Sequence, residues 1–118
     1  MEKTIKINGQ DYVLEAKAFT GILYESQFGE DPLPVMWRVA DVFRGKGEVA
    51  DVGMIPLAKL TWAMAKTHDE SIPDFDTWFK GLDTFPTIDV FNQISELVLA
   101  NLVTTSDIKP KNPKRAEN

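Results

Sequence analysis

The sequence IPLAKLTWAMAKTH, residues 55–68, is the stretch around which the rest of the chain is expected to fold. At about 100° per residue, a helix here places its apolar side chains on two broad sides instead of in one stripe. Lys59 and Lys66 share the one clearly charged strip. Because a surface helix usually has a single apolar stripe, the pattern predicts a central helix that is covered over most of its circumference.

The sequence before residue 18 alternates between apolar and polar residues in two short runs. Residues 3–7 and 11–16 show this period of two, which is typical of half-buried strands. Asn8 and Gly9 lie between the runs and form the strongest short signal for a β-hairpin. An isolated hairpin is barely stable in water, so the apolar face of this one is expected to lie on helices.

Four further helices are predicted on either side of the central one, at residues 18–28, 31–44, 74–82 and 87–103. In the first of these helices, Phe19, Ile22 and Leu23 share one side with Ser26. This grouping follows the helical spacing of three and four residues.

The stretch at residues 45–53 contains three glycines and is predicted to be a loop, with a short extended piece at 48–50. Thr87 is expected to cap the last helix. The fold class is therefore α+β, mainly α, with an N-terminal β-hairpin packed on about five helices. Residues 1–103 are expected to form a single globular domain, and residues 104–118 a flexible, disordered tail.

The charge and composition of the chain limit the function classes. Residues 1–103 contain 9 basic and 16 acidic residues, a net charge of −7, whereas residues 104–118 have a net charge of +2. So acidic a body is a poor partner for nucleic acid, whose phosphates attract cations. The sequence has no cysteine, no apolar run long enough to cross a membrane and no signal-peptide pattern. A cytoplasmic protein without nucleic-acid or membrane partners is expected.

Signals of enzymatic chemistry are weak. His68, the one histidine, precedes Asp69 and Glu70, and Asp74 and Asp76 follow nearby. Their spacing fits neither a metalloprotease motif nor a calcium-binding loop, so we expect the acidic residues to cap and flank helix ends. We therefore expect no enzyme and assign no catalytic, cofactor-binding or metal-binding residue.

The other notable features concern protein–protein contact. Trp37 lies opposite the apolar face of its helix, so that either another element covers it or a partner does. The apolar arcs of the helices at 55–68 and 87–103 are wider than one contact needs, which fits either core on both sides or a groove for a client or a second copy. The candidate partner-binding residues are Trp37, Trp62, Ile94, Leu97 and Val98.

The order of segments resembles a known protein family. The segments that carry the resemblance are MEKTIKINGQDYVLEA, FTGILYESQFGEDP, IPLAKLTWAMAKTHDESIPDFDTWF and TIDVFNQISELVLANL, followed by a Pro- and Lys-rich end. Over residues 3–103 the chain looks like the tail assembly chaperones of long-tailed (siphovirus-type) bacteriophages, especially those that infect Gram-positive bacteria. KINGQDYVLEA and FDTWF are the most similar parts.

The resemblance implies a role without catalysis. Such chaperones bind the long, hydrophobic tape measure protein, keep it soluble and help to recruit tail tube subunits around it. They act in the host cytoplasm during assembly and are absent from the mature virion. By this resemblance we expect the tape measure protein as partner, the tail tube protein as a further partner, no cofactor, and weak homo-oligomers.

Two other classes of protein are alternatives. One is a virion structural part, such as a tail terminator or a head–tail joining protein, although such proteins usually show more strand pattern. The other is a small acidic inhibitor or adaptor protein whose surface mimics nucleic acid, which would need its acidic residues to cluster on one face.

Overall fold

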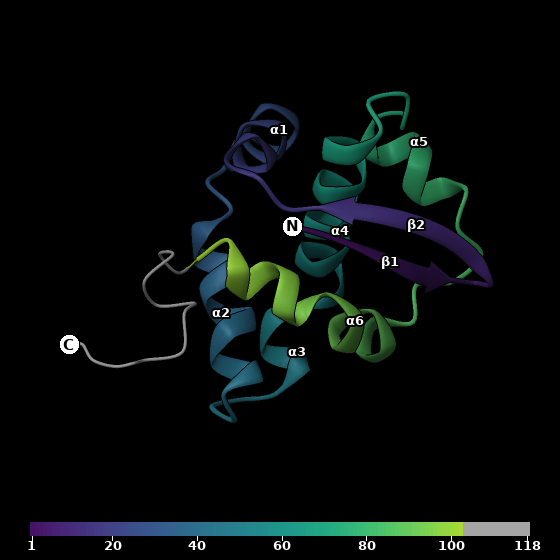
Figure 1. Ribbon diagram of the computed structural model, residues 1–118. Helices are drawn as coiled ribbons and strands as arrows, with labels where there is room; N and C mark the ends of the chain where they lie inside the picture. Colours follow the sequence, from purple (N-terminus) through teal and green to yellow (C-terminus); the bar gives the residue numbers. More distant parts are fainter. Residues whose placement is uncertain (103–118) are drawn as a thin grey trace.

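The computed structural model describes residues 1–102 of the 118-residue chain. Within that range, two strands and six helices follow one another along the chain (Figure 1). They are β1 (Glu2–Ile7), β2 (Gln10–Glu15), α1 (Ala18–Phe28), α2 (Leu33–Phe43), α3 (Val49–Val52), α4 (Met54–His68), α5 (Phe75–Lys80) and α6 (Thr87–Ala100). The predicted fold class is confirmed: an N-terminal hairpin packs on a mainly helical body. The predicted tail at 104–118 lies outside the described residues.

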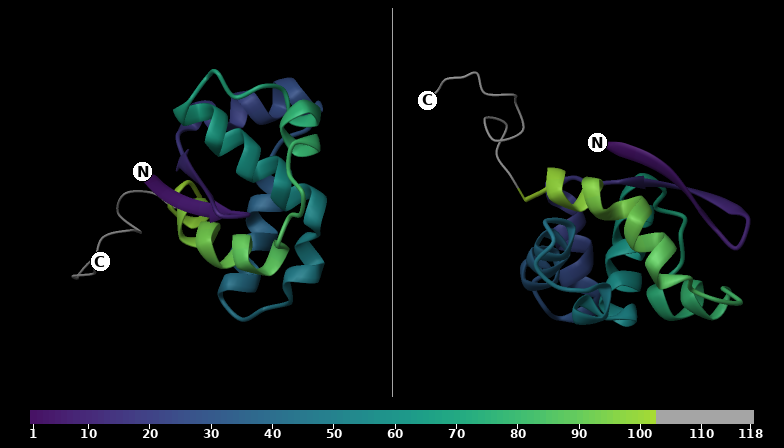
Figure 2. Two further views of the ribbon diagram at one scale, coloured as in Figure 1. Left: turned by 90° about the vertical axis from the view of Figure 1, so that its right-hand side faces the viewer. Right: turned by 90° about the horizontal axis from the view of Figure 1, so that it is seen from below.

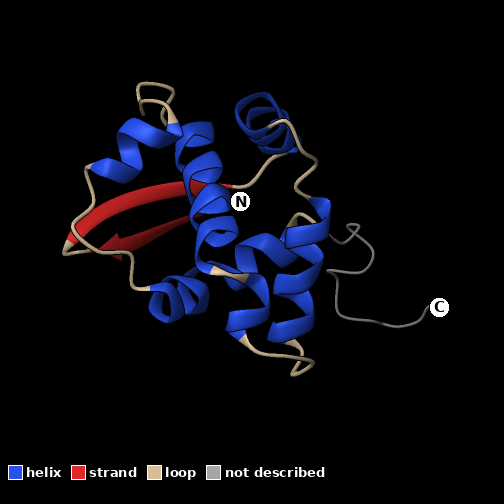
Figure 3. Cartoon of the chain, turned by 180° about the vertical axis from the view of Figure 1, so that it is seen from behind, coloured by secondary structure: helices blue, strands red, loops and turns tan. Residues whose placement is uncertain are grey.

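Helix α4 is the centre of the fold. It contacts β2, α1, α3, α5 and α6, and Figure 1 shows it behind the two strands with the other helices around it. Seen from behind, in Figure 3, α4 lies in front of the two strands. Eight consecutive or neighbouring residues of the helix are buried: Leu57, Ala58, Leu60, Thr61, Trp62, Ala63, Met64 and Ala65. The prediction that this helix is covered over most of its circumference is confirmed.

The N-terminal hairpin has the predicted register and turn. Ile5 pairs with Tyr12 and Ile7 with Gln10, in an antiparallel ladder. Asn8 and Gly9 both have positive φ values, 55° and 79°, as a two-residue turn that matches the twist of the strands requires. Ile5, Ile7 and Leu14 are buried. The apolar face of the sheet therefore lies on helices, as expected.

The outer edge of β1 is covered by α6 and by the loop before it. The side-chain amide of Gln93 pairs with the backbone of Lys6: Gln93 Oε1 accepts from Lys6 N at 2.9 Å, and Gln93 Nε2 donates to Lys6 O at 3.1 Å. Asn8 Nδ2 donates to Thr84 O at 2.9 Å. The two bonds of Gln93 satisfy backbone groups that an edge strand would otherwise present to another chain.

Replacing Gln93 with alanine should lower the free energy of unfolding by about 1–3 kcal/mol, because two hydrogen bonds of about 0.5–1.5 kcal/mol each are lost. Asn92→Ala is the matched control, since Asn92 is exposed and next to Gln93. Urea denaturation of both variants measures the difference. Equal stability of the two variants would show that the amide contributes nothing to the attachment of the hairpin.

Two details of the predicted helices were wrong. Residues 49–52 form the short helix α3 instead of a loop with an extended piece, so the described chain has six helices where about five were predicted. The backbone N–H of Glu48 donates to Asp51 Oδ2 at 2.8 Å, and the side chain of Glu48 accepts from the backbone N–H of Asp51. This capping box starts the helix, which is too short to show helical periodicity in its sequence. Thr87 is the first residue of α6 and makes no capping bond, and α6 ends at Ala100.

The buried side of α1 also differs from the apolar side seen in its sequence. Thr20 and Tyr24 are buried, whereas Phe19 and Ile22 are each 56% exposed. The hydroxyl groups of Thr20 and Thr67 lie 2.7 Å apart and hold α1 to α4. Because this contact between α1 and α4 is polar, the helical spacing of apolar residues alone predicts the wrong buried face for α1.

Candidate functional site

Four of the five candidate partner-binding residues are core residues, so their assignment as surface contacts is wrong for this fold. Trp62, Ile94, Leu97 and Val98 are each at most 2% exposed. Helix α6 contacts β1, α2 and α4, so most of its wide apolar arc is used within the molecule, and Ile88 at its start is exposed. In the right-hand view of Figure 2, α6 runs alongside the hairpin, between it and α2.

Trp62 belongs to an aromatic cluster that joins three helices. Its ring meets those of Phe28 and Phe75 edge to face, with centroid distances of 5.5 and 6.4 Å. Its Nε1 donates to Pro73 O at 2.8 Å. Lys59 Nζ lies 4.8 Å from the centroid of the Phe28 ring, a cation–π contact at the rim of the cluster. Trp62 is therefore fully engaged inside the fold.

Trp37 is on the surface. Its side chain is 53% exposed, while Val35, Met36 and Val39 on the other side of α2 are buried. The hairpin lies on α4 and α6 and leaves this indole in contact with water. Of the two interpretations open from the sequence, the structure excludes complete coverage by another described element.

Three further apolar side chains, on α1 and at the start of α2, are half-exposed, and the sequence pattern did not mark them as candidates. Phe19 and Ile22 on α1 are 56% exposed, and Leu33 on α2 is 52% exposed. We call Phe19, Ile22, Leu33 and Trp37 the α1–α2 apolar set. The grouping of Phe19 with Ile22 was visible in the sequence, but it gave no sign that this side faces water.

Helices α1 and α2 approach each other closely at Gly21 and Pro32. A Cβ atom on Gly21 would lie 3.8 Å from Pro32 Cγ, which is ordinary van der Waals contact. A shallow pocket follows this junction and is lined by Ala18, Gly21, Ile22, Glu25, Asp31 and Pro32. The pocket lies between the exposed side of α1 and the beginning of α2, the helix that carries Leu33 and Trp37.

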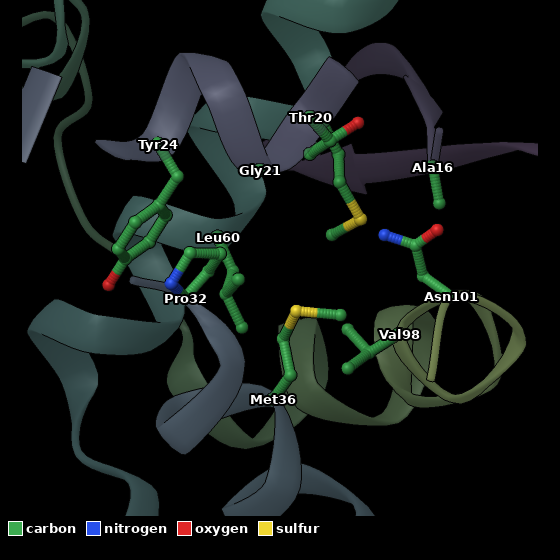
Figure 4. Close-up of a pocket in the computed structure, with 10 residues that line it drawn as sticks. Ala16, Thr20, Gly21, Tyr24, Pro32, Met36, Leu60, Val98 and Asn101 are labelled. Atoms are coloured by element: carbon green, nitrogen blue, oxygen red, sulfur yellow. The ribbon is translucent and has the colours of Figure 1, made fainter. Parts of the chain in front are cut away.

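A second, deeper pocket lies beneath this junction (Figure 4). In Figure 4 the side chains of Pro32, Leu60, Met36 and Val98 point into one space, with Asn101 at its edge. Its free volume is about 20 Å³, which is room for roughly one water molecule. The pocket is a small apolar depression and does not have the size of a typical small-molecule site.

Another apolar groove lies at the far end of the fold, between α3, the start of α4 and the start of α6. It is lined by Glu48, Val49, Ala50, Gly53, Met54, Thr87 and Ile88. Met54 is 46% exposed and Ile88 67%. These two side chains are separate from the α1–α2 apolar set and supply a useful comparison for it.

The acidic residues that follow His68 serve the backbone, as expected. Asp69 accepts from Ser71 N at 3.0 Å, and its hydrogen bonds from Ser71 hold the pKa of its carboxyl below the usual value. Asp74 caps α5 by accepting from Thr77 N at 2.9 Å. His68 instead lies beside Glu2 and Glu15, with Nδ1 at 3.7 Å and 3.3 Å from their oxygens. Glu2, Glu15 and His68 are far apart in the sequence, so no motif predicts that they lie together.

Comparison of the chain with protein-family models, with curated proteins and with solved structures finds no match. Among residues 1–102, no helix combines the length and the apolar character that a membrane crossing needs.

Proposed function

We propose that this protein is a tail assembly chaperone of a long-tailed bacteriophage. In this role it binds and solubilises the tape measure protein, helps to recruit tail tube subunits, acts in the host cytoplasm and is absent from the mature virion. The observation that carries the proposal is the α1–α2 apolar set, four half-exposed side chains on consecutive helices. It adds to the resemblance of segment order and to the acidic character of residues 1–103.

The exposed apolar area is large enough to matter for binding. With Trp37 53% exposed, on the order of 100 Å² of its surface remains in water. At about 25 cal/mol per Å², covering that area contributes about 2–3 kcal/mol from the burial of apolar surface alone. Phe19, Ile22 and Leu33 add further area of the same kind. A surface of this chemistry suits the apolar face of a client helix.

Such a docking mode has consequences for stoichiometry and for salt dependence. One copy covers only a few turns of a long helical client, so several copies bind along it, with weak contacts between neighbours. The contacts are mainly apolar, and added salt screens charge–charge interactions without weakening apolar contact. The complex is therefore expected to persist when the salt concentration is raised. The net negative charge keeps the coated client soluble.

Co-expression with the tape measure protein from the same gene cluster tests the proposal. The client should move from the insoluble to the soluble fraction and co-purify with several copies of this chain. A double variant, Ile22→Ser with Trp37→Ser, should lose this effect, whereas Ile88→Ser should retain it, because Ile88 is exposed in the separate groove between α3, α4 and α6.

Two results would contradict the proposal: a client that stays insoluble beside the wild-type protein, or one that is equally soluble alone. Either result would favour a virion structural part, such as a tail terminator or a head–tail joining protein. If the double variant solubilised the client as well as the wild-type protein does, the chaperone role would stand, but the client would bind at a surface other than the α1–α2 apolar set.

A further inference from the structure

Three side chains with metal-binding atoms meet where the open end of the hairpin reaches the end of α4. Glu2 is the first residue of β1, Glu15 is the last residue of β2, and His68 is the last residue of α4. One carboxylate oxygen from each glutamate and a ring nitrogen of His68 all lie within 4.8 Å of one another. The proposed chaperone role uses none of these residues.

The distances between the three groups are close to those of a metal site. Zinc binds imidazole nitrogen and carboxylate oxygen at about 2.0–2.2 Å in a tetrahedron, which places neighbouring ligand atoms about 3.3 Å apart. His68 Nδ1 lies 3.3 Å from Glu15 Oε1 and 3.7 Å from Glu2 Oε2. The side chain of Glu2 is 54% exposed, so it has the freedom to complete the triangle.

The backbone holds the three residues in place. Glu2 and Glu15 are directly opposite each other in the strand ladder. The N–H of Ala16 donates to Met1 O at 3.0 Å and extends the pairing beyond the two glutamates. On the helix side, Thr67 is bound to Thr20 at 2.7 Å, immediately before His68. The site therefore needs side-chain adjustment and no rearrangement of the fold.

The local charge also points to a cation at this position. Two carboxylates directly opposite each other in a ladder repel, unless a positive charge lies between them. Lys17 Nζ lies 2.9 Å from Glu15 Oε2 and occupies that oxygen, while Oε1 faces His68. The hydrogen bond from Lys17 lowers the pKa of Glu15. The side chain of Glu15 is only 13% exposed, so its carboxylate is held in place between Lys17 and His68.

We propose that Glu2, Glu15 and His68 bind a divalent transition-metal ion, with Zn²⁺ as the best fit and water completing its coordination. One imidazole with two carboxylates is a ligand set for zinc and its neighbours, whereas magnesium and calcium take oxygen ligands. The bound ion connects both ends of the hairpin to α4.

Calorimetric titration of the untagged, chelator-treated full chain with Zn²⁺ tests the proposal. We expect one ion per chain, and a weakening of at least 10-fold in His68→Gln and Glu15→Gln. Lys17→Met should bind more tightly than wild type, because the lysine that competes for Glu15 is gone. Glu96→Gln, an exposed carboxylate on α6, is the control and should leave the affinity unchanged. Zinc should raise the melting temperature of wild type and not that of His68→Gln.

The single histidine of the chain gives a direct second measurement. On addition of Zn²⁺, the ring-nitrogen NMR signals of His68 in the wild-type protein should shift to those of an imidazole bound through Nδ1. This readout needs no variant and so does not depend on how the variants fold. Unchanged His68 signals, or zinc affinity in His68→Gln equal to that of wild type, would overturn the proposal and assign any bound ion to other surface carboxylates.

Discussion

Replacing Trp62 with alanine should lower the free energy of unfolding by about 3–5 kcal/mol, the usual range for removing a large buried aromatic side chain. Trp62 is 2% exposed and joins α4 to Phe28 of α1 and Phe75 of α5. Its loss also leaves Pro73 O without the indole N–H that now donates to it. A domain of this size has only about 5–15 kcal/mol of stability, so the variant should be close to unfolding at 37 °C.

Urea denaturation followed by circular dichroism measures this effect, and a matched pair of conservative variants divides it into parts. Trp62→Phe and Trp78→Phe remove the same atoms from two buried indoles. Trp62 donates a hydrogen bond, whereas Nε1 of Trp78 is buried with no partner among the described residues. Trp62→Phe should therefore be the less stable of the two by about 1 kcal/mol. The reverse order would show that the bond to Pro73 contributes nothing net.

The elements that the sequence predicts best are those whose patterns are local. The Asn8-Gly9 turn determines the register of the hairpin, because few other residue pairs adopt positive φ at both positions. The breadth of the apolar pattern in residues 55–68 correctly indicates a helix enclosed on nearly all sides. The short α3 could not be seen, because four residues are too few to show a helical period.

The exposed surface was harder to predict, because a helical pattern shows which side chains group together and not which group faces water. In α1 the buried side is fixed by a hydroxyl pair, Thr20 with Thr67, whose partners are 47 residues apart. In α6 an arc that looks wide enough for a client is filled by contacts to β1, α2 and α4. Trp37 was correctly placed off the apolar face of its helix, because that face is narrow and clear in the sequence.

Replacing Trp37 with alanine should weaken client binding by about 2–4 kcal/mol, which corresponds to roughly 30–1000-fold in the dissociation constant. The reason is that the half-exposed indole is the largest member of the α1–α2 apolar set. The free energy of unfolding of the free protein should stay within about 1 kcal/mol of wild type. The indole is half-exposed, and alanine has a higher helix propensity than tryptophan. Calorimetry with the co-purifying segment of the tape measure protein gives the first quantity, and urea denaturation gives the second.

Ile88→Ala provides the matched control, since Ile88 is 67% exposed but lies in the separate groove of α3, α4 and α6. It should leave the affinity for the client within about twofold of wild type, a difference below about 0.5 kcal/mol. The contrast between the two variants distinguishes a defined docking surface from non-specific binding through any exposed apolar residue.

If Trp37→Ala bound the client normally and unfolded several kcal/mol more easily, the indole would belong to the core. If both variants lost affinity equally, the client would be held without a preferred surface. Reduced binding in Trp37→Ala alone, at unchanged stability, is the result expected when α1 and α2 form the surface that holds the client.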